Sequence, residues 1–252
     1  MTKTEFSIAA AQTSSVPGDI AANAARHVKL AELAAGNGID VVVFPELSLT
    51  GYLPNIAAEV AIEAGDDKLE PLRMAARKFN VSIHAGCPIA SHERRPYIGT
   101  FVIATNGEIE AYRKRFVHAD EDTFFVSGEQ TVVCKAGEMR IGVAICADIH
   151  NETHPADVSK ANADIYAAGV AITPTGIERA HIAMAEYAVR YRFLTVMSNY
   201  SESTGGYEIG GQSAVWDTDG KLLAKAEVNN KCLVVARSVD SQWTGQVVAC
   251  DL

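Results

Sequence analysis

The chain has 252 residues, of which 48% are hydrophobic and 21% are charged, and its formal net charge is -9. A chain of this length and composition can bury a substantial core, and we expect a single domain over residues 1–252. The negative charge argues against a nucleic-acid-binding protein, which needs clustered Lys and Arg. The densest basic run, Arg113 to Arg115, is too short for that role.

The first third of the chain has the pattern of alternating strands and helices. Apolar runs at residues 6–12, 41–44 and 81–86 predict strands, and segments 19–35 and 67–79 between them predict helices. The aspartate that begins the first helical segment is a favourable N-cap. Because the order is βαβαβ, we expect these strands to pair in parallel.

Tight turns appear in the middle and near the end of the chain. Asn106-Gly107 stands between two strand-like runs and predicts a β-hairpin, and Ala136-Gly137 and Asp219-Gly220 predict two more tight connections. The alternation of helices and strands returns in a helix from about 152, a strand at 163–168, a helix at 176–192 and a strand at 194–198. Together these elements predict mixed β-sheets with helices on their outer sides.

The cysteines and the N-terminal residues bear on location. The five cysteines are odd in number and contain no CxxC pair, so neither a disulfide framework nor a structural zinc site is indicated. Residues 1–7 lack the apolar segment of a signal peptide, and no apolar run approaches the roughly 18 residues of a membrane span. We therefore expect a cytoplasmic protein with no membrane partner.

Three reactive residues stand at the ends of strand-like runs. Cys146 follows the run 139–145, Glu46 follows 40–45, and Lys114 follows 109–113. Side chains at strand ends are a common place for active sites in α/β enzymes. We therefore expect the thiol, the carboxylate and the ammonium to share one site.

The chemistry of these groups fits acyl transfer from an amide. Such a reaction needs a nucleophile, a base that becomes an acid, and donors for the oxyanion. Cys146 would be the nucleophile and Glu46 the base, and the ammonium of Lys114 would both lower the pKa of the thiol and stabilise the oxyanion. The backbone N–H of Ala147 would be the second oxyanion donor.

These three segments resemble the carbon–nitrogen hydrolase, or nitrilase, superfamily. The shared patterns are Phe-Pro-Glu at 44–46, Tyr-Arg-Lys at 112–114, and a strand that ends at Cys146. Glu121 lies seven residues after the lysine, as does the second glutamate of the superfamily. Further matches are Phe125, Gly128, the Gly-Gly-Gln-Ser segment at 210–213 and the Asp-Gly-Lys segment at 219–221.

The resemblance implies a nitrilase-like α/β fold, a four-layer α-β-β-α sandwich with mixed sheets. It implies that Glu46 is the general base, Lys114 the oxyanion stabiliser and Cys146 the nucleophile, while Glu121 positions the substrate or Lys114. It also implies a homodimer or higher even-numbered homo-oligomer that acts on a small-molecule amide. We expect no cofactor and no metal.

Some positions depart from the superfamily pattern. Phe116 stands where a histidine is frequent, Ala147 replaces a frequent aromatic residue, and residues 150–155 replace a segment with Arg, Pro and Glu. None of these changes removes a reactive group. All of them lie close to the expected substrate, so the specificity of any one member does not transfer.

We predict that the protein is a hydrolase that uses a cysteine to cleave a non-peptide C–N bond. We expect a small linear carboxamide or carbamoyl compound as substrate and a thioester intermediate. A true nitrilase is the alternative within the same chemistry, and a catalytically inactive binding or scaffold protein is the alternative of another class. A zinc site is a further reading, with ligands among Cys146, Asp148, His150 and His154.

The charge of the substrate stays open. Glu178, Glu202 and Glu208 are acids that would meet a cationic substrate end, although a solvated surface charge explains each of them as well. A helix N-terminus at residues 173–176 would favour an anion instead.

Overall fold

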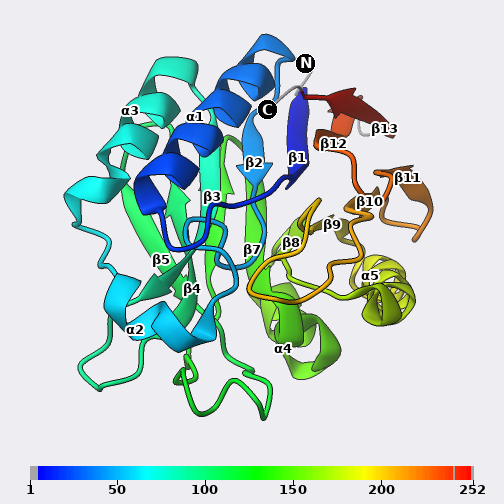
Figure 1. The fold of residues 1–252 in the computed structure, drawn as a ribbon. Helices are drawn as coiled ribbons and strands as arrows, with labels where there is room; N and C mark the ends of the chain where they lie inside the picture. Colours follow the sequence, from blue (N-terminus) through cyan, green and yellow to red (C-terminus); the bar gives the residue numbers. More distant parts are fainter. Residues whose placement is uncertain (1–4, 241, 251–252) are drawn as a thin grey trace.

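The computed structural model describes residues 5–240 and 242–250. Residues 1–4, on which part of the location prediction depends, and residues 251–252 at the end of the predicted domain lie outside the described residues. Two β-sheets face each other, and helices cover the outer side of each sheet (Figure 1). The predicted α-β-β-α sandwich is confirmed.

The first sheet has seven strands in the order β13-β12-β1-β2-β3-β4-β5. β1, β2 and β3 pair in parallel, as their alternation with helices predicted, and the other pairs are antiparallel. The bounds are β1 Phe6–Gln12, β2 Val41–Val43, β3 Ser82–Ile89, β4 Tyr97–Ile103, β5 Ile109–Arg113, β12 Cys232–Val239 and β13 Gln242–Ala249.

The second sheet has six strands in the order β11-β10-β9-β8-β7-β6. Its centre, β7-β8-β9, is parallel, and its outer pairs are antiparallel. The bounds are β6 Val133–Ala136, β7 Met139–Ile145, β8 Ile165–Gly169, β9 Leu194–Ser198, β10 Ala214–Trp216 and β11 Leu222–Lys225.

Two pairs of helices form the outer layers (Figure 1). α1 and α3 lie against the seven-stranded sheet, and α4 and α5 lie against the six-stranded sheet. The bounds are α1 Ile20–Gly36, α2 Ala57–Val60, α3 Glu70–Phe79, α4 Thr153–Lys160 and α5 Ile177–Tyr191. Short 3-10 helices η1 Pro54–Ile56, η2 Asp67–Leu69, η3 Cys146–His150 and η4 Pro174–Gly176 complete the described helices.

Local sequence explains why these elements form. The Asp19 side chain accepts a hydrogen bond from the Ala22 N–H at 2.9 Å, so it caps α1 as predicted. β2 consists of three valines buried on both faces, between the helical layer and the second sheet. The three predicted tight connections are present, with left-handed glycines at Gly107, Gly137 and Gly220.

The main difference from the sequence-based expectation lies at the C-terminal end of the chain. β12 pairs antiparallel with β1 along its whole length, from Phe6 opposite Ser238 to Gln12 opposite Cys232. This pairing joins segments more than 200 residues apart, and no local turn signals it. It makes β1 an inner strand of the sheet.

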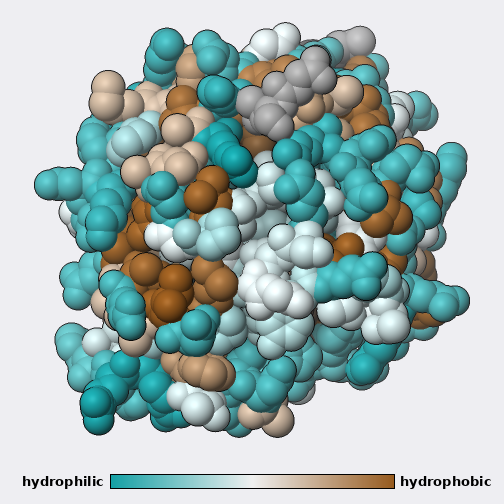
Figure 2. Space-filling model, in the orientation of Figure 1, coloured by the Kyte–Doolittle hydropathy of each residue, from teal (hydrophilic) through white to brown (hydrophobic). Residues whose placement is uncertain are grey.

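None of the described helices is both long and apolar enough to cross a bilayer. Figure 2 shows that the face seen in Figure 1 is mostly hydrophilic, with separate groups of apolar residues and a pale central area of near-neutral residues.

Candidate active site

The fold brings together the three reactive residues that the sequence places far apart. Glu46, Lys114 and Cys146 follow the carboxyl ends of β2, β5 and β7, and so belong to both sheets. Lys114 Nζ lies 2.7 Å from Glu46 Oε1. The thiol of Cys146 interacts with the Glu46 carboxylate, and all three residues are buried.

Cys146 has an unusual backbone conformation. Its φ is +40°, a region that residues other than glycine rarely adopt, and it is the first residue of η3. A nucleophile on such a sharp strand-to-helix turn projects its side chain away from the strand, and the N–H groups of the first helical turn lack intrahelical acceptors. The N–H of Ala147 belongs to this turn. The backbone of Ala171, after β8, interacts with the Cys146 sulfur and acts to lower the pKa of the thiol.

Lys114 is held by two carboxylates. Besides Glu46, Glu121 contacts its Nζ at 3.0 and 2.8 Å through Oε1 and Oε2. Glu121 also accepts hydrogen bonds from the Tyr52 hydroxyl and from the backbone N–H of His118, both at 2.8 Å. Burial opposes the charge of Glu121, but Lys114 and these donors outweigh it and lower the pKa of Glu121. Glu121 is therefore a charged anchor for the lysine.

Glu46 differs from Glu121, because only one of its two carboxylate oxygens accepts a hydrogen bond in the described part of the chain. Oε1 accepts from Lys114, whereas Oε2 has no hydrogen-bond partner among the described residues. Burial raises the pKa of Glu46 to about 7, against the opposing effect of Lys114, and the charge of Glu121 adds to the rise. A carboxylate with a pKa near 7 and a free acceptor beside a thiol is suited to general-base catalysis.

The expected effect of Lys114 on the thiol needs a correction. The ammonium does lower the pKa of Cys146, but burial and the negative charge of Glu46 outweigh it, so the pKa of the thiol is well above its usual value. Cys146 is therefore a neutral thiol at neutral pH. It needs a base to become nucleophilic, and the Glu46 carboxylate, which interacts with the thiol, is the candidate.

Two glycines allow the Glu46 segment to pass between the sheets. A Cβ atom on Gly86 of β3 would lie 2.4 Å from the Leu47 nitrogen, and a Cβ atom on Gly169 of β8 would lie 2.5 Å from the Phe44 oxygen. Any side chain at either position would displace the segment that carries Glu46. One glycine belongs to each sheet, so both sheets fix the position of the carboxylate.

A third glycine supports the Lys114 segment. The N–H of Gly128 donates to the Lys114 carbonyl at 2.7 Å, and a Cβ atom on Gly128 would lie 2.3 Å from the Arg113 oxygen. Phe125 is buried in the core, and its N–H donates to the Glu121 carbonyl. The spacing of Glu121, Phe125 and Gly128 in the sequence thus corresponds to one loop that closes over the lysine.

The sequence-based interpretation missed several residues that build the site. The Tyr52 hydroxyl fixes Glu121, and the Tyr200 hydroxyl donates to the Glu46 carbonyl at 2.7 Å. Asn199 holds the loop after β8, because its side-chain oxygen accepts from the Ile172 N–H and its NH₂ donates to the Ile172 and Gly211 carbonyls. Tyr52 ends the run that begins with Phe-Pro-Glu, which was the only local signal for any of them.

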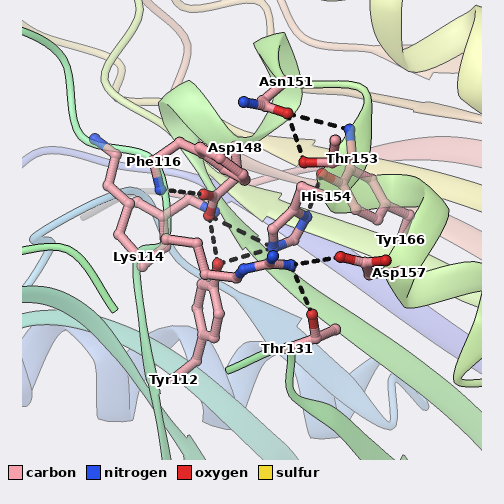
Figure 3. A network of polar contacts seen from close by, with 12 residues as sticks. Tyr112, Lys114, Phe116, Thr131, Asp148, Asn151, Thr153, His154, Asp157 and Tyr166 are labelled. Carbon is pink, nitrogen blue, oxygen red and sulfur yellow. Dashed lines mark hydrogen bonds and ion pairs between the residues drawn. The ribbon is translucent and has the colours of Figure 1, made fainter. Parts of the chain in front are cut away.

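The zinc reading is wrong about the local conformation. It required an extended segment with its alternate side chains on one side, whereas residues 146–150 form a 3-10 helix. Asp148 and His154 instead contact Tyr112, at 2.6 Å from the Asp148 oxygen and 2.8 Å from the His154 Nε2 (Figure 3). No group of three His, Cys, Asp or Glu side chains within residues 5–240 and 242–250 is arranged to hold a metal.

The groups that the sequence offers as determinants of substrate charge are three glutamates and a helix N-terminus. Glu178, Glu202 and Glu208 are all exposed, and Glu202 forms an ion pair with Lys231 at 2.7 Å. Residues 174–176 form the short η4, which leads directly into α5. Among the described residues, none of these groups forms a hydrogen bond or ion pair with Glu46, Lys114 or Cys146 that would select one charge.

Comparisons with known proteins agree with this geometry. The carbon-nitrogen hydrolase family model matches residues 7–246. The amidase from Nesterenkonia sp. AN1, solved as a cysteine-to-alanine variant in complex with butyramide, has a TM-score of 0.83 at 22% identity, over 94% of this chain and 92% of that chain. Saccharomyces cerevisiae Nit3 of the nitrilase superfamily has a TM-score of 0.85 at 20% identity, over 94% and 90% of the two chains.

The match with relatives of curated function covers a smaller share of their own length. An (R)-stereoselective amidase from Pseudomonas sp. is 26% identical over 83% of this chain and 76% of its own length. The glutamine-dependent NAD(+) synthetase of Thermotoga maritima is 25% identical over 84% of this chain, which spans only 38% of that relative.

The chain belongs to the carbon-nitrogen hydrolase family, because the family model covers nearly all of it. It is a carbon–nitrogen hydrolase with the nitrilase-superfamily fold.

Proposed function

We propose that this protein hydrolyses a small linear carboxamide or carbamoyl compound through a thioester. Glu46 takes the thiol proton as Cys146 Sγ attacks the carbonyl carbon, and Lys114 with the Ala147 N–H stabilises the oxyanion. The tetrahedral intermediate collapses as Glu46 returns the proton to the nitrogen, and ammonia or an amine leaves. Water, deprotonated by Glu46, then attacks the thioester and releases the acid and the thiol.

One observation carries this proposal. Glu46 Oε1 is held by Lys114, while Oε2 is buried without a hydrogen-bond partner among the described residues, and the same carboxylate interacts with the neutral thiol of Cys146. An unpaired buried carboxylate oxygen costs free energy, so its retention next to a thiol favours a catalytic role. A scaffold protein has no need of such an arrangement, which is why we prefer the enzyme.

The substrate class rests on the size of the site and on similarity. Cys146 is only 6% exposed, so little room exists for a bulky group around the thiol in this conformation. The likeness to an amidase crystallised with butyramide and to an (R)-stereoselective amidase supports an amide over other acyl compounds.

The direct test is a screen for released ammonia. Purified protein would be incubated with short amides that carry neutral, cationic or anionic tails, butyramide and glutamine among them. We expect turnover of at least one amide by the wild type and none by Cys146→Ala. A silent panel, or equal turnover by the variant, would refute the proposal.

A nitrilase remains the second candidate, because the bromoxynil-specific nitrilase of Klebsiella pneumoniae subsp. ozaenae is 28% identical over 58% of this chain. Attack on a nitrile would use the same thiol and form a thioimidate. Comparing each amide with its matching nitrile distinguishes the two. We expect the amide to react faster.

The assembly and location stay proposals too. We propose an even-numbered homo-oligomer that works in the cytoplasm without a cofactor, since no step above needs one. Light scattering of the purified protein would test the subunit number, and a monomer would contradict it.

A further inference from the structure

A network of four buried side chains joins the segments that carry Lys114 and Cys146. Its members are Tyr112 of β5, Asp148 of η3, His154 of α4 and Tyr166 of β8, and we call it the Tyr–Asp–His network. Each side chain is fully buried. Figure 3 shows the contacts among the four. The network thus connects the lysine strand, the nucleophile turn and an outer helix.

Asp148 is the centre of this network. Its Oδ2 accepts from the Tyr112 hydroxyl at 2.6 Å and from the Ile145 N–H at 2.9 Å, and its Oδ1 accepts from the Phe116 N–H at 3.1 Å. Ile145 directly precedes the nucleophile Cys146. One carboxylate therefore binds the chain beside the thiol and, at the same time, the chain on both sides of the lysine.

The donors and acceptors of the network follow one order, from Tyr166 through His154 and Tyr112 to Asp148. Because the Tyr112 hydroxyl donates to Asp148, its oxygen must accept from His154 Nε2–H, at 2.8 Å. His154 Nδ1, now without a proton, accepts from the Tyr166 hydroxyl at 3.0 Å. Burial lowers the pKa of His154, which keeps it neutral and fits this arrangement. Every polar atom of His154 and Tyr112 has a partner.

The energetics favour a geometric role. Replacing a buried charged network by apolar side chains is frequently neutral or even stabilising, so stability alone does not account for it. What such a network supplies is a defined arrangement of the segments that it joins. Here those segments carry Lys114 and Cys146, whose separation decides whether the oxyanion lies within reach of the ammonium.

We propose that Tyr112, Asp148 and His154 are positioning residues that fix the Cys146 turn relative to Lys114. This proposal rests on the proposed function, since it assumes that these two groups act together. All three side chains are fully buried, so we expect them to act through the segments that they hold and not by contact with the substrate. Their effect is on the rate of thiol attack, with little effect on substrate binding.

The test measures alkylation of Cys146 by iodoacetamide, followed by peptide mass spectrometry, so it does not depend on knowing which amide is hydrolysed. We expect Tyr112→Phe and His154→Leu to slow alkylation by about tenfold. Tyr112→Phe removes a donor to Asp148, and His154→Leu removes the group that orients the Tyr112 hydroxyl toward Asp148. His154→Gln restores a neutral donor and acceptor and should recover most of the rate. With any amide that is turned over, kcat should fall in the first two variants while KM changes less than about twofold.

A matched control separates positioning from general loss of packing. Tyr187→Phe also removes one buried hydroxyl, which donates to the Ile149 carbonyl at 3.0 Å at the far side of the same turn. We expect Tyr187→Phe to alkylate at the wild-type rate. Wild-type rates in Tyr112→Phe and His154→Leu, or equal slowing in Tyr187→Phe, would overturn the proposal. Failure of the wild-type Cys146 to be alkylated would instead count against the proposed function.

Discussion

Two buried polar regions lie side by side in this enzyme and differ in how completely they are paired. The reactive cluster of Glu46, Lys114, Glu121 and Cys146 leaves Glu46 Oε2 without a partner. The Tyr–Asp–His network pairs both nitrogens of its histidine and gives its carboxylate three donors. Both regions are buried, so burial alone does not explain the difference.

The comparison shows how the proposed catalytic carboxylate differs from a fully paired one. An unpaired buried carboxylate oxygen costs free energy, and it has an elevated proton affinity that a reaction can use. A saturated network holds its atoms in one arrangement and has no spare proton acceptor. The pKa of Glu46, raised by burial to about 7, expresses this difference.

The largest expected effect comes from removal of the nucleophile. Cys146→Ala should lower kcat by at least about 10⁴-fold, because the thioester cannot form. Ammonia release from the best amide of the panel measures it. Cys134→Ala, at a buried thiol of β6 outside the reactive cluster, is the control and should keep wild-type activity. Substantial turnover by Cys146→Ala would mean that another group is the nucleophile.

Glu46→Gln should have the next largest effect. The amide keeps the size of the side chain and a contact with Lys114, but it cannot take the thiol proton, so kcat should fall by about 10²- to 10⁴-fold. The kcat from steady-state kinetics and the rate of iodoacetamide alkylation should fall together. If alkylation keeps its wild-type rate, Glu46 does not activate the thiol.

The pH dependence should follow the ionisation of Glu46. Because the base must be ionised and burial raises its pKa to about 7, the wild-type kcat/KM should rise with pH up to about 7 and then level off. Below that point we expect a loss of about tenfold per pH unit. The rising limb should be absent from Glu46→Gln. A limb centred near the usual carboxylate value of about 4.3 would show that the site is more hydrated than the structure indicates.

A smaller effect is expected at the glycine that makes room for Glu46. Gly86→Ala should cost about 1–3 kcal/mol of unfolding free energy, because its Cβ would overlap the Glu46 segment. Activity should fall with it. Gly36→Ala at the end of α1 meets nothing within 4 Å and should leave both quantities unchanged or raise stability by up to about 1 kcal/mol. Denaturant unfolding measures both variants, and equal stabilities would contradict the steric argument.

The sequence predicted most elements, because their signals are local. Apolar runs, a capping aspartate and Asn-Gly or Asp-Gly turns lie within a few residues of the structure that they specify. The pairing of β12 with β1 had no such signal. Tyr200 was likewise invisible as a support for Glu46, because 154 residues separate the two partners of that hydrogen bond.

The sequence by itself determined which chemical groups are present and that each closes a strand. It predicted the wrong balance of effects on the thiol, because a neighbouring ammonium is readable from a motif whereas the extent of burial is not. Only the tertiary structure decided that Glu46 keeps one oxygen free and that Asp148 binds both catalytic segments. Proton affinity depends on solvent exclusion and on distances of a few ångströms, and both arise when the two sheets pack against each other.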